Sequence, residues 1–363
     1  MTELTGILVD RIRANGPMPF AEFMEVALYD PDHGYYSTAD SPAGWRGDYL
    51  TSPELDPSFG TLWTGAFEKV WEACGGPREF TLVEIGPGAG GFSSAVLTAA
   101  TGPFGEALRF VLVEISEARR IGLKQLFDDD RVSFAGSVAA VGPVVGCVFA
   151  NEILDNLPVH VIEMRDEQVV ELHVDERQGE PVERWLPCSN PELVERARRS
   201  ELKASRLEVC LAAEEMAAQC ARLIKRGAVV FVDYGRRRGR EDSLLAYSAT
   251  GVDDRLLERA GQKDITHHVD WGPVMEILHE AGLEITGPAL QRDVLRALGA
   301  DRLNRELKDL HERAVAGGKG VEAVRATSRR QALAVLMDPS GLGGLQVVSG
   351  TRGISLDFPA RAD

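Results

Sequence analysis

The chain has 363 residues, of which 44% are hydrophobic and 26% charged, and its formal net charge is −16. This composition suffices for a packed core in one large domain or two smaller ones. No apolar run reaches the roughly 18 residues that a membrane-crossing helix needs, and the acidic balance argues against nucleic acid, which is bound through basic patches. We therefore expect a soluble protein that binds neither a membrane nor nucleic acid.

The five cysteines are scattered and include no CxxC pair. Neither a metal site nor a disulfide framework is therefore predicted. The amino-terminal segment has the pattern of an amphipathic helix with mixed acids and bases, unlike a secretory signal or a transit peptide. We therefore expect a cytoplasmic location.

The first region, residues 1–78, has helical periodicity over 3–14, 19–28 and 57–74. A stretch rich in Gly, Pro, Asp and Ser interrupts these helices at residues 30–56. Because this stretch is long for an ordinary connection, a functional loop is predicted. The region is interpreted as a helical amino-terminal extension with a loop that covers a cofactor.

From about residue 80, short β-branched runs alternate with helical segments, the pattern of a parallel sheet covered by helices. Seven strands are predicted, at residues 81–86, 109–115, 132–136, 144–151, 228–235, 283–288 and 345–350. The fold class is therefore α/β, with a Rossmann-like seven-stranded sheet.

Between the fourth and fifth of these strands, three short antiparallel strands are predicted and are followed by two helices. The strands are expected at 159–164, 169–174 and 182–187, and the helices at about 191–200 and 205–226. We interpret them as an α+β subdomain inserted at the carboxyl edge of the sheet. A further helical region, about 291–337, precedes the last strand. The expected division is 1–78, 79–158, 159–226 and 227–363.

The strongest local motif is the glycine loop at residues 86–91, which joins an apolar strand to a helix. Such a loop lets the backbone approach a ligand closely, and the helix that follows offers unpaired N–H groups. Gly86, Gly88 and Gly91 also satisfy GxGxxG, the fingerprint of dinucleotide-binding proteins. The loop alone therefore leaves a nicotinamide enzyme open.

Two acids accompany the loop. Glu84 precedes it in an E-x-G-x-G-x-G pattern, which is more typical of S-adenosylmethionine (SAM) enzymes. Glu114 ends the next strand, where a carboxylate can accept hydrogen bonds from both ribose hydroxyls of either cofactor. The first acid favours SAM, and the second does not discriminate.

A second polar motif, Ala-Asn-Glu-Ile-Leu-Asp-Asn-Leu-Pro, lies at residues 150–158 at the end of the fourth strand. Open α/β sheets bind ligands beyond the carboxyl ends of their strands, so Glu152 and Asp155 are candidate functional residues. The alternative is that Asn151 or Glu152 only caps a helix.

Taken together, the motifs resemble the MidA-type methyltransferases, whose mitochondrial members methylate an arginine of a respiratory complex I subunit. The resemblance covers most of the chain. It rests on GPMPFAEFMEVALYDPDHGYY (16–36), GDYLTSPEL (47–55), VEIGPGAG (83–90), VEIS (113–116), ANEILDNLP (150–158), VDYG (232–235) and GQKDITHHVD (261–270).

The resemblance implies a class I SAM methyltransferase fold, SAM as the cofactor and a protein or peptide acceptor. It makes a respiratory complex subunit a candidate acceptor and leaves a homodimer open. The implied cofactor-binding residues are Asp48, Thr51, Ser52, Glu84, Gly86, Gly88, Gly90, Glu114, Ile115 and Asn151.

For an arginine acceptor, a carboxylate must localise the charge of the guanidinium and receive a proton, because the guanidinium is a poor nucleophile. Glu152 is the expected bidentate clamp, and Asp155 the second catalytic candidate. Tyr234 and His267 are expected to line the acceptor pocket, although a core or surface role for the histidine stays open. The alternatives are a small-molecule methyltransferase, an NAD-dependent oxidoreductase and a non-catalytic assembly factor with this fold.

Overall fold

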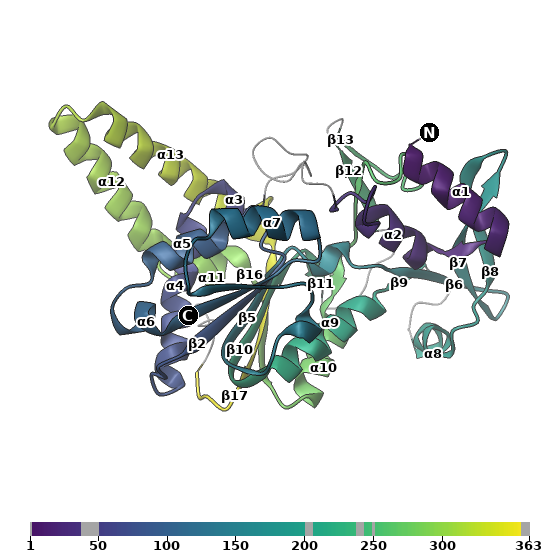
Figure 1. Ribbon diagram of the computed structural model, residues 1–363, viewed down its shortest axis with the longest axis horizontal. Helices are drawn as coiled ribbons and strands as arrows, with labels where there is room; N and C mark the ends of the chain where they lie inside the picture. Colours follow the sequence, from purple (N-terminus) through teal and green to yellow (C-terminus); the bar gives the residue numbers. More distant parts are fainter. Residues whose placement is uncertain (1, 38–50, 200–205, 237–242, 249–250, 357–363) are drawn as a thin grey trace.

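The computed structural model describes residues 2–37, 51–199, 206–236, 243–248 and 251–356. A central sheet lies between two layers of helices, and a smaller subdomain flanks it on the side of the amino terminus (Figure 1). In the part of the chain so described, no helix has both the length and the apolar character needed to cross a membrane.

The central sheet contains all seven strands predicted from the sequence. They are β2 (Phe80–Ile85), β3 (Leu108–Val113), β4 (Val132–Ala135), β5 (Val144–Asn151), β10 (Ile224–Asp233), β16 (Glu284–Leu290) and β17 (Gln346–Arg352). Their order is β16-β17-β10-β5-β2-β3-β4. The α/β fold class is thereby confirmed.

One feature of the predicted sheet is corrected: the sheet is mixed rather than parallel. Strand β17 runs antiparallel to both of its neighbours, β10 and β16. Leu290 at the end of β16 pairs with Gln346 at the start of β17. The chain therefore leaves and re-enters the sheet at the same edge, which forces the last strand to run in the opposite direction.

Successive side chains of each strand point to opposite faces of the sheet and pack in two separate hydrophobic cores. In β5, Cys147 and Phe149 join the core under α4 (Ser58–Ala73) and α5 (Gly91–Ala99), where Phe149 stacks on Phe92 with ring centroids 4.4 Å apart. Val148 and Ala150 point to the other face, against α9 (Leu211–Leu223) and α10 (Trp271–Glu280). This alternation is the period of two that a strand imposes.

The smaller subdomain combines the inserted strands with the amino-terminal helices. Its sheet holds β6 (His160–Arg165), β7 (Gln168–Arg177), β8 (Glu180–Pro187), β9 (Leu207–Val209) and β1 (Met18–Pro19). The order is β1-β7-β6-β9, with β8 paired to β7. Helices α1 (Glu3–Asn15) and α2 (Phe20–Tyr29) bury Leu8 and Phe23 against Val161 and Leu172 of this sheet.

The antiparallel strands predicted in the insertion are therefore present, and α8 (Pro191–Arg199) follows them. The two-residue β1 and three-residue β9 were not predicted. A small three-stranded sheet of β12 (Leu245–Ser248), β13 (Gly251–Asp253) and β14 (Asp264–Thr266) packs into the same core through Ala246 and Ile265.

The helical region before the last strand divides into α11 (Gln291–Ala297), α12 (Ala300–Ala316) and α13 (Gly320–Leu336). Helices α12 and α13 form an antiparallel hairpin that projects from the end of the molecule opposite the smaller subdomain (Figure 1). Leu307 and Ala314 of α12 and Ala323 and Ala326 of α13 are buried.

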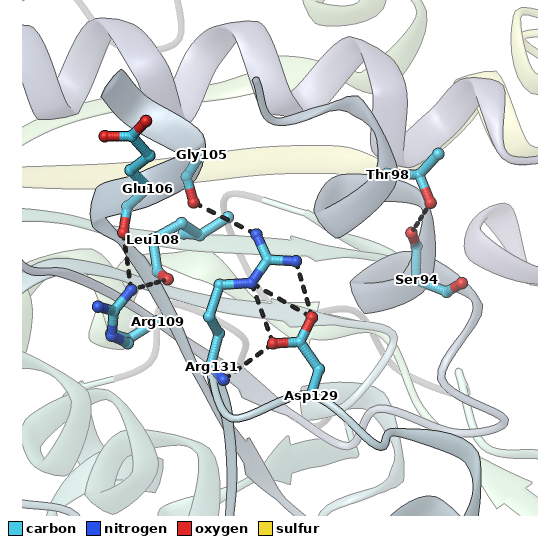
Figure 2. Close-up of polar contacts among 8 residues, drawn as sticks. All are labelled: Ser94, Thr98, Gly105, Glu106, Leu108, Arg109, Asp129 and Arg131. Carbon is cyan, nitrogen blue, oxygen red and sulfur yellow. Dashed lines mark hydrogen bonds and ion pairs between the residues drawn. The ribbon is translucent and has the colours of Figure 1, made fainter. Parts of the chain in front are cut away.

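At the edge of the central sheet, Arg131 fixes the turn that leads into β4 (Figure 2). Its guanidinium binds the Asp129 carboxylate, with Nη2 2.7 Å from Oδ2, and its Nη1 donates to the carbonyl of Gly105 at 3.2 Å. Because both charged side chains are partly exposed, this pair contributes on the order of 1 kcal/mol or less. Its role is to tie the turn to α6 (Gly102–Ala107).

Candidate active site

A cavity of about 1130 Å³ opens at the carboxyl ends of β2, β3 and β5. One end, called here the cofactor end, is lined by the glycine loop, by Glu84, Glu114 and Asn151, and by the short helix α3 (Ser52–Leu55). The other, called the outer end, is lined by α2, the start of β6 and α9. The cavity therefore joins the ligand-binding edge of the sheet to the smaller subdomain.

The glycine loop needs glycine at its turning points. Gly86 has φ +65° and Gly88 has φ +53°, values that residues with a Cβ rarely adopt. A Cβ on Gly86 would overlap Ile153, whereas a Cβ on Gly88 would lie 3.6 Å from Glu54 Oε1, on the cavity side. Both glycines line the cavity, whereas Gly90, with φ +80°, packs against Phe127 instead.

The two acids beside the loop both line the cavity and are buried. The Ser93 hydroxyl of α5 donates to Glu84 Oε2, and burial raises the pKa of Glu84 to about 7. Glu114 Oε1 accepts from the backbone N–H of Ser116 at 2.8 Å, and burial also raises the pKa of Glu114. Neither acid has a cation bound to it among the described residues, so each is available to a ligand.

Glu152 is held in an uncommon backbone conformation at the cavity wall. Its φ is +53°, and its N–H donates to the carbonyl of Val232 at 2.8 Å. Its Oε1 accepts from Asn151 Nδ2 at 2.7 Å and from the backbone N–H of Ser52 at 3.4 Å. Burial first, and then the negative charges of Asp233 and Glu54, raise the pKa of Glu152 to about 8.

The backbone N–H groups of the turn that follows Glu152 are capped by Asp233 rather than by Asn151 or Glu152. Asp233 Oδ2 accepts from the backbone N–H groups of Ile153, Leu154 and Asp155 at 3.0, 2.8 and 3.3 Å. Burial raises the pKa of Asp233 to about 7. Asp233 therefore caps this turn, whereas Glu152, held through Oε1 by Asn151 and Ser52, lines the cavity.

Asp155 is buried and is absent from the lining of the cavity. Its Oδ1 has no hydrogen-bond partner among the described residues, and burial, followed by Asp233 and Asp264, raises its pKa well above the usual range. The structure therefore separates the two predicted catalytic acids: Glu152 faces the cavity, and Asp155 lies behind it.

The two residues expected to contact the acceptor do not line this cavity either. His267 is buried, its Nε2 3.2 Å from the carbonyl of Leu157 and its Nδ1 3.2 Å from that of His268, and burial lowers its pKa to about 4. Tyr234 is 37% exposed, and its N–H donates to Asp233 Oδ1 at 2.8 Å. His267 thus has the surroundings of a core histidine.

The predicted loop over the cofactor is only partly covered by the described residues. Asp48 lies outside them, as do residues 38–50. Thr51 lines the cavity. Ser52 instead accepts a hydrogen bond through its hydroxyl from Gln291 Nε2 at 2.9 Å. Ile115 lines the cavity and is 56% exposed.

Sequence reasoning missed several residues of the cavity wall. At the cofactor end these are Glu54 and Arg119, and at the outer end they include Tyr29, His160 and Met216. Glu54 lies within the quoted GDYLTSPEL motif, which could have indicated it. Tyr29 lies within the quoted motif at 16–36, which could have indicated it too. Arg119, His160 and Met216 lie in none of the quoted motifs and reach the cavity only through packing of distant elements.

The wall of the cofactor end fits SAM. Two buried acceptor atoms there, Glu54 Oε2 and Asn151 Oδ1, have no hydrogen-bond partner among the described residues. Buried polar atoms are normally satisfied, so these two suit a ligand that brings donors and positive charge. SAM brings an ammonium, two ribose hydroxyls and a sulfonium. In the described residues no group of three or more His, Cys, Asp or Glu side chains could hold a metal ion.

Comparison with known proteins points the same way. The model of a family described as "Putative S-adenosyl-L-methionine-dependent methyltransferase" matches residues 64–289. The chain is 29% identical over 325 residues to the mitochondrial protein arginine methyltransferase NDUFAF7 of Xenopus tropicalis, covering 81% of this chain and 75% of that relative. The human protein of the same name is 27% identical over 333 residues, covering 83% of this chain and 74% of its own length.

Among solved structures, a Burkholderia thailandensis protein bound to S-adenosylhomocysteine (SAH) superimposes with a TM-score of 0.84 at 25% identity, covering 99% of this chain and 95% of that one. A second Burkholderia thailandensis structure, at 24% identity and a TM-score of 0.81, shares the fold. Both matches extend over the sheet, the smaller subdomain and the helical hairpin.

Proposed function

Since this chain belongs to the MidA-type family of SAM-dependent methyltransferases, we propose that it methylates an arginine side chain of a protein acceptor. Membership sets aside the nicotinamide oxidoreductase that the glycine pattern left open. The curated relatives are named protein arginine methyltransferases, which supports the choice of acceptor.

One observation on this chain carries the proposal: acidic side chains outnumber basic ones in the cavity wall. Among the residues that the structure describes, this wall includes eight carboxyl side chains and two arginines, Arg11 and Arg119. The carboxylates are Glu22, Glu25, Asp30, Glu54, Glu84, Glu114, Glu152 and Glu215. Such a wall suits two cations, the sulfonium of the cofactor and the guanidinium of an arginine, better than a neutral or anionic acceptor.

At the cofactor end, we assign the ribose hydroxyls to Glu114 and the ammonium to the region of Glu84, Asn151 and Glu54. The loop glycines Gly86 and Gly88 let the backbone approach the ligand, and Gly90 turns the chain into α5. When bound, SAM supplies a methyl group on a positively charged sulfur.

At the acceptor, Glu152 would hold the guanidinium and remove its proton. With a pKa of about 8, the carboxyl is mostly protonated at neutral pH until a cation arrives. A guanidinium beside it favours the carboxylate, which then accepts bidentate hydrogen bonds and localises the positive charge. The proton given up by the arginine nitrogen on methylation passes to this carboxylate and then to water.

The roles predicted for Asp155, Tyr234 and His267 stay predictions, and we assign direct contact with the acceptor to residues of the cavity wall instead. A respiratory complex subunit is the first acceptor to test, by family resemblance. The cytoplasmic location also stays a prediction, since the relatives carry mitochondrial names. Size-exclusion chromatography with light scattering tests the homodimer.

A matched pair of peptides tests the arginine assignment. One peptide contains arginine and the other contains citrulline, which has nearly the same shape but no charge. We expect the arginine peptide alone to become methylated, with mass spectrometry placing the methyl group on the guanidinium. In the SAH complex at pH 7 its binding should also release close to one proton, measured by calorimetry in buffers of different ionisation enthalpy. A methyl group on another residue, or equal binding of citrulline, would contradict the proposal.

A further inference from the structure

A histidine that no motif indicated faces the outer end of the cavity. His160 is the first residue of β6 and lines the cavity wall. Its Nδ1 lies 2.7 Å from Oε1 of Glu171 on the neighbouring strand β7. The Glu171 side chain is only 5% exposed, whereas that of His160 is 21% exposed. A buried carboxylate thus holds the inner side of a ring whose outer side is open.

The contacts of Glu171 fix which ring nitrogen carries the proton. Its Oε2 accepts from the thiol of Cys188 at 3.7 Å, and an ionised carboxylate has only acceptor oxygens. Nδ1 of His160 must therefore be the donor to Oε1, as is usual when a carboxylate orients a histidine. Nε2 has no hydrogen-bond partner among the described residues, and in the neutral ring it carries a lone pair directed away from Glu171.

The position of His160 along the chain places it beside the reacting group rather than at it. The wall runs from Glu152 through Asn156, Leu157 and Pro158 to His160. Around His160 the outer end is completed by Tyr29 of α2 and by α9. A side chain held at Glu152 would therefore bring its own polypeptide past this part of the wall.

We propose that His160, held by Glu171, favours a polypeptide over an isolated guanidinium by accepting a hydrogen bond from a backbone N–H of the chain that flanks the target arginine. The inference rests on the proposed function, because it assumes a polypeptide acceptor. Glu171 is a positioning residue, and it acts only through the ring that it orients.

Two probes separate contact with the flanking chain from contact with the arginine itself. The first is an acetylated and amidated nonapeptide with four glycines on each side of an arginine, and the second is propylguanidine, which has the same cation but no amide N–H. Both are titrated into the full-length protein saturated with SAH. We expect His160→Ala to weaken binding of the nonapeptide about five- to tenfold, the effect of one lost hydrogen bond in a desolvated site, and to leave the short probe unchanged.

Matched variants test whether the pair merely supports the fold. His160→Gln keeps a distal oxygen and should restore much of the affinity, whereas Glu171→Leu should reproduce the loss seen with His160→Ala. His173→Ala is the control, since His173 lies on β7, contacts the carbonyl of Glu171 at 3.2 Å and does not line the cavity. It should bind both probes like the wild type.

The outcomes are distinct. Equal affinity of wild type and His160→Ala for the nonapeptide overturns the inference and leaves the arginine proposal standing. An equal loss for both probes overturns it too, because His160 would then act at the arginine. A drop in SAH affinity that accompanies the loss assigns His160 a structural role. If the wild type binds neither probe, the proposed function itself fails, and this inference fails with it.

Discussion

Replacing Glu152 by glutamine should stabilise the free protein while it abolishes most of the activity. In the folded chain the carboxyl has a pKa of about 8, raised from 4.5 chiefly by burial. At neutral pH it is therefore protonated in the fold and ionised in the unfolded chain, so wild-type stability falls as pH rises from about 4.5 to about 8. Glutamine has nearly the same shape, keeps an acceptor for Asn151 and does not titrate.

The size of the effect follows from the shift. A pH of 7 lies about 2.5 units above the pKa of this carboxyl in the unfolded chain. At about 1.36 kcal/mol per unit, protonating it on folding lowers the free energy of unfolding by about 3 kcal/mol. Glu152 lines a cavity open to water, so we halve this figure, to about 1.5 kcal/mol, for solvent screening. The gain should be complete above pH 8 and absent below pH 4.5, the two ends of the shift.

Urea denaturation at pH 4.5, 7 and 8.5 measures this difference, and methyl incorporation into the arginine peptide measures the loss of activity. Turnover should fall by about 10²-fold or more, the usual effect of losing an acid–base group, while SAH affinity stays close to wild type. Glu215→Gln is the control, because Gln219 and Arg222 lower the pKa of Glu215 and its removal gives no such gain. Equal stability of Glu152→Gln and wild type at pH 8.5, together with full turnover, would refute both the electrostatic account and the clamp.

Two further substitutions test the cofactor end. Glu114→Gln should weaken SAH binding by roughly ten- to a hundredfold, since hydrogen bonds to a charged group are worth about 1.5–3 kcal/mol, and calorimetry that finds unchanged affinity would remove Glu114 from the ribose site. Gly86→Ala should lose SAH binding. It should also lower the melting temperature more than Gly102→Ala does. Both glycines have positive φ (+65° and +59°), but only the Cβ at position 86 meets another atom, on Ile153. Similar melting temperatures for the two variants would contradict this reading of the loop.

The strands of the central sheet could be predicted because each is an apolar run that local sequence marks on both sides. The direction of β17 could not, since it depends on where α11 to α13 return the chain. Strands β1 and β9 were missed for a related reason. Two or three residues carry no periodicity, and Met18 and Pro19 are extended in a ladder only because β7 lies beside them.

At the cofactor end, the residues that follow the carboxyl ends of neighbouring strands could be predicted from the sequence. Glu84, Glu114, Asn151 and Glu152 meet there because parallel strands end at one edge. Asp155 was also predicted in the site, yet the turn capped by Asp233 directs it behind the wall. At the outer end only α2 lies in one of the quoted motifs, at 16–36, whereas β6 and α9 join it only in the folded chain.

The pairing of β1 with β7 delays the folding of the amino-terminal helices during synthesis. Met18 pairs with Val174, so 174 − 18 = 156 residues separate the partners. At about 5–20 residues per second, the partner strand leaves the ribosome roughly 8–30 s after β1. Throughout that interval the apolar faces of α1 and α2, with Leu8 and Phe23, have no sheet to cover them. The segment of α1 and α2 is thus made long before it can fold against its sheet, and a nascent chain paused before residue 174 would present it to chaperones.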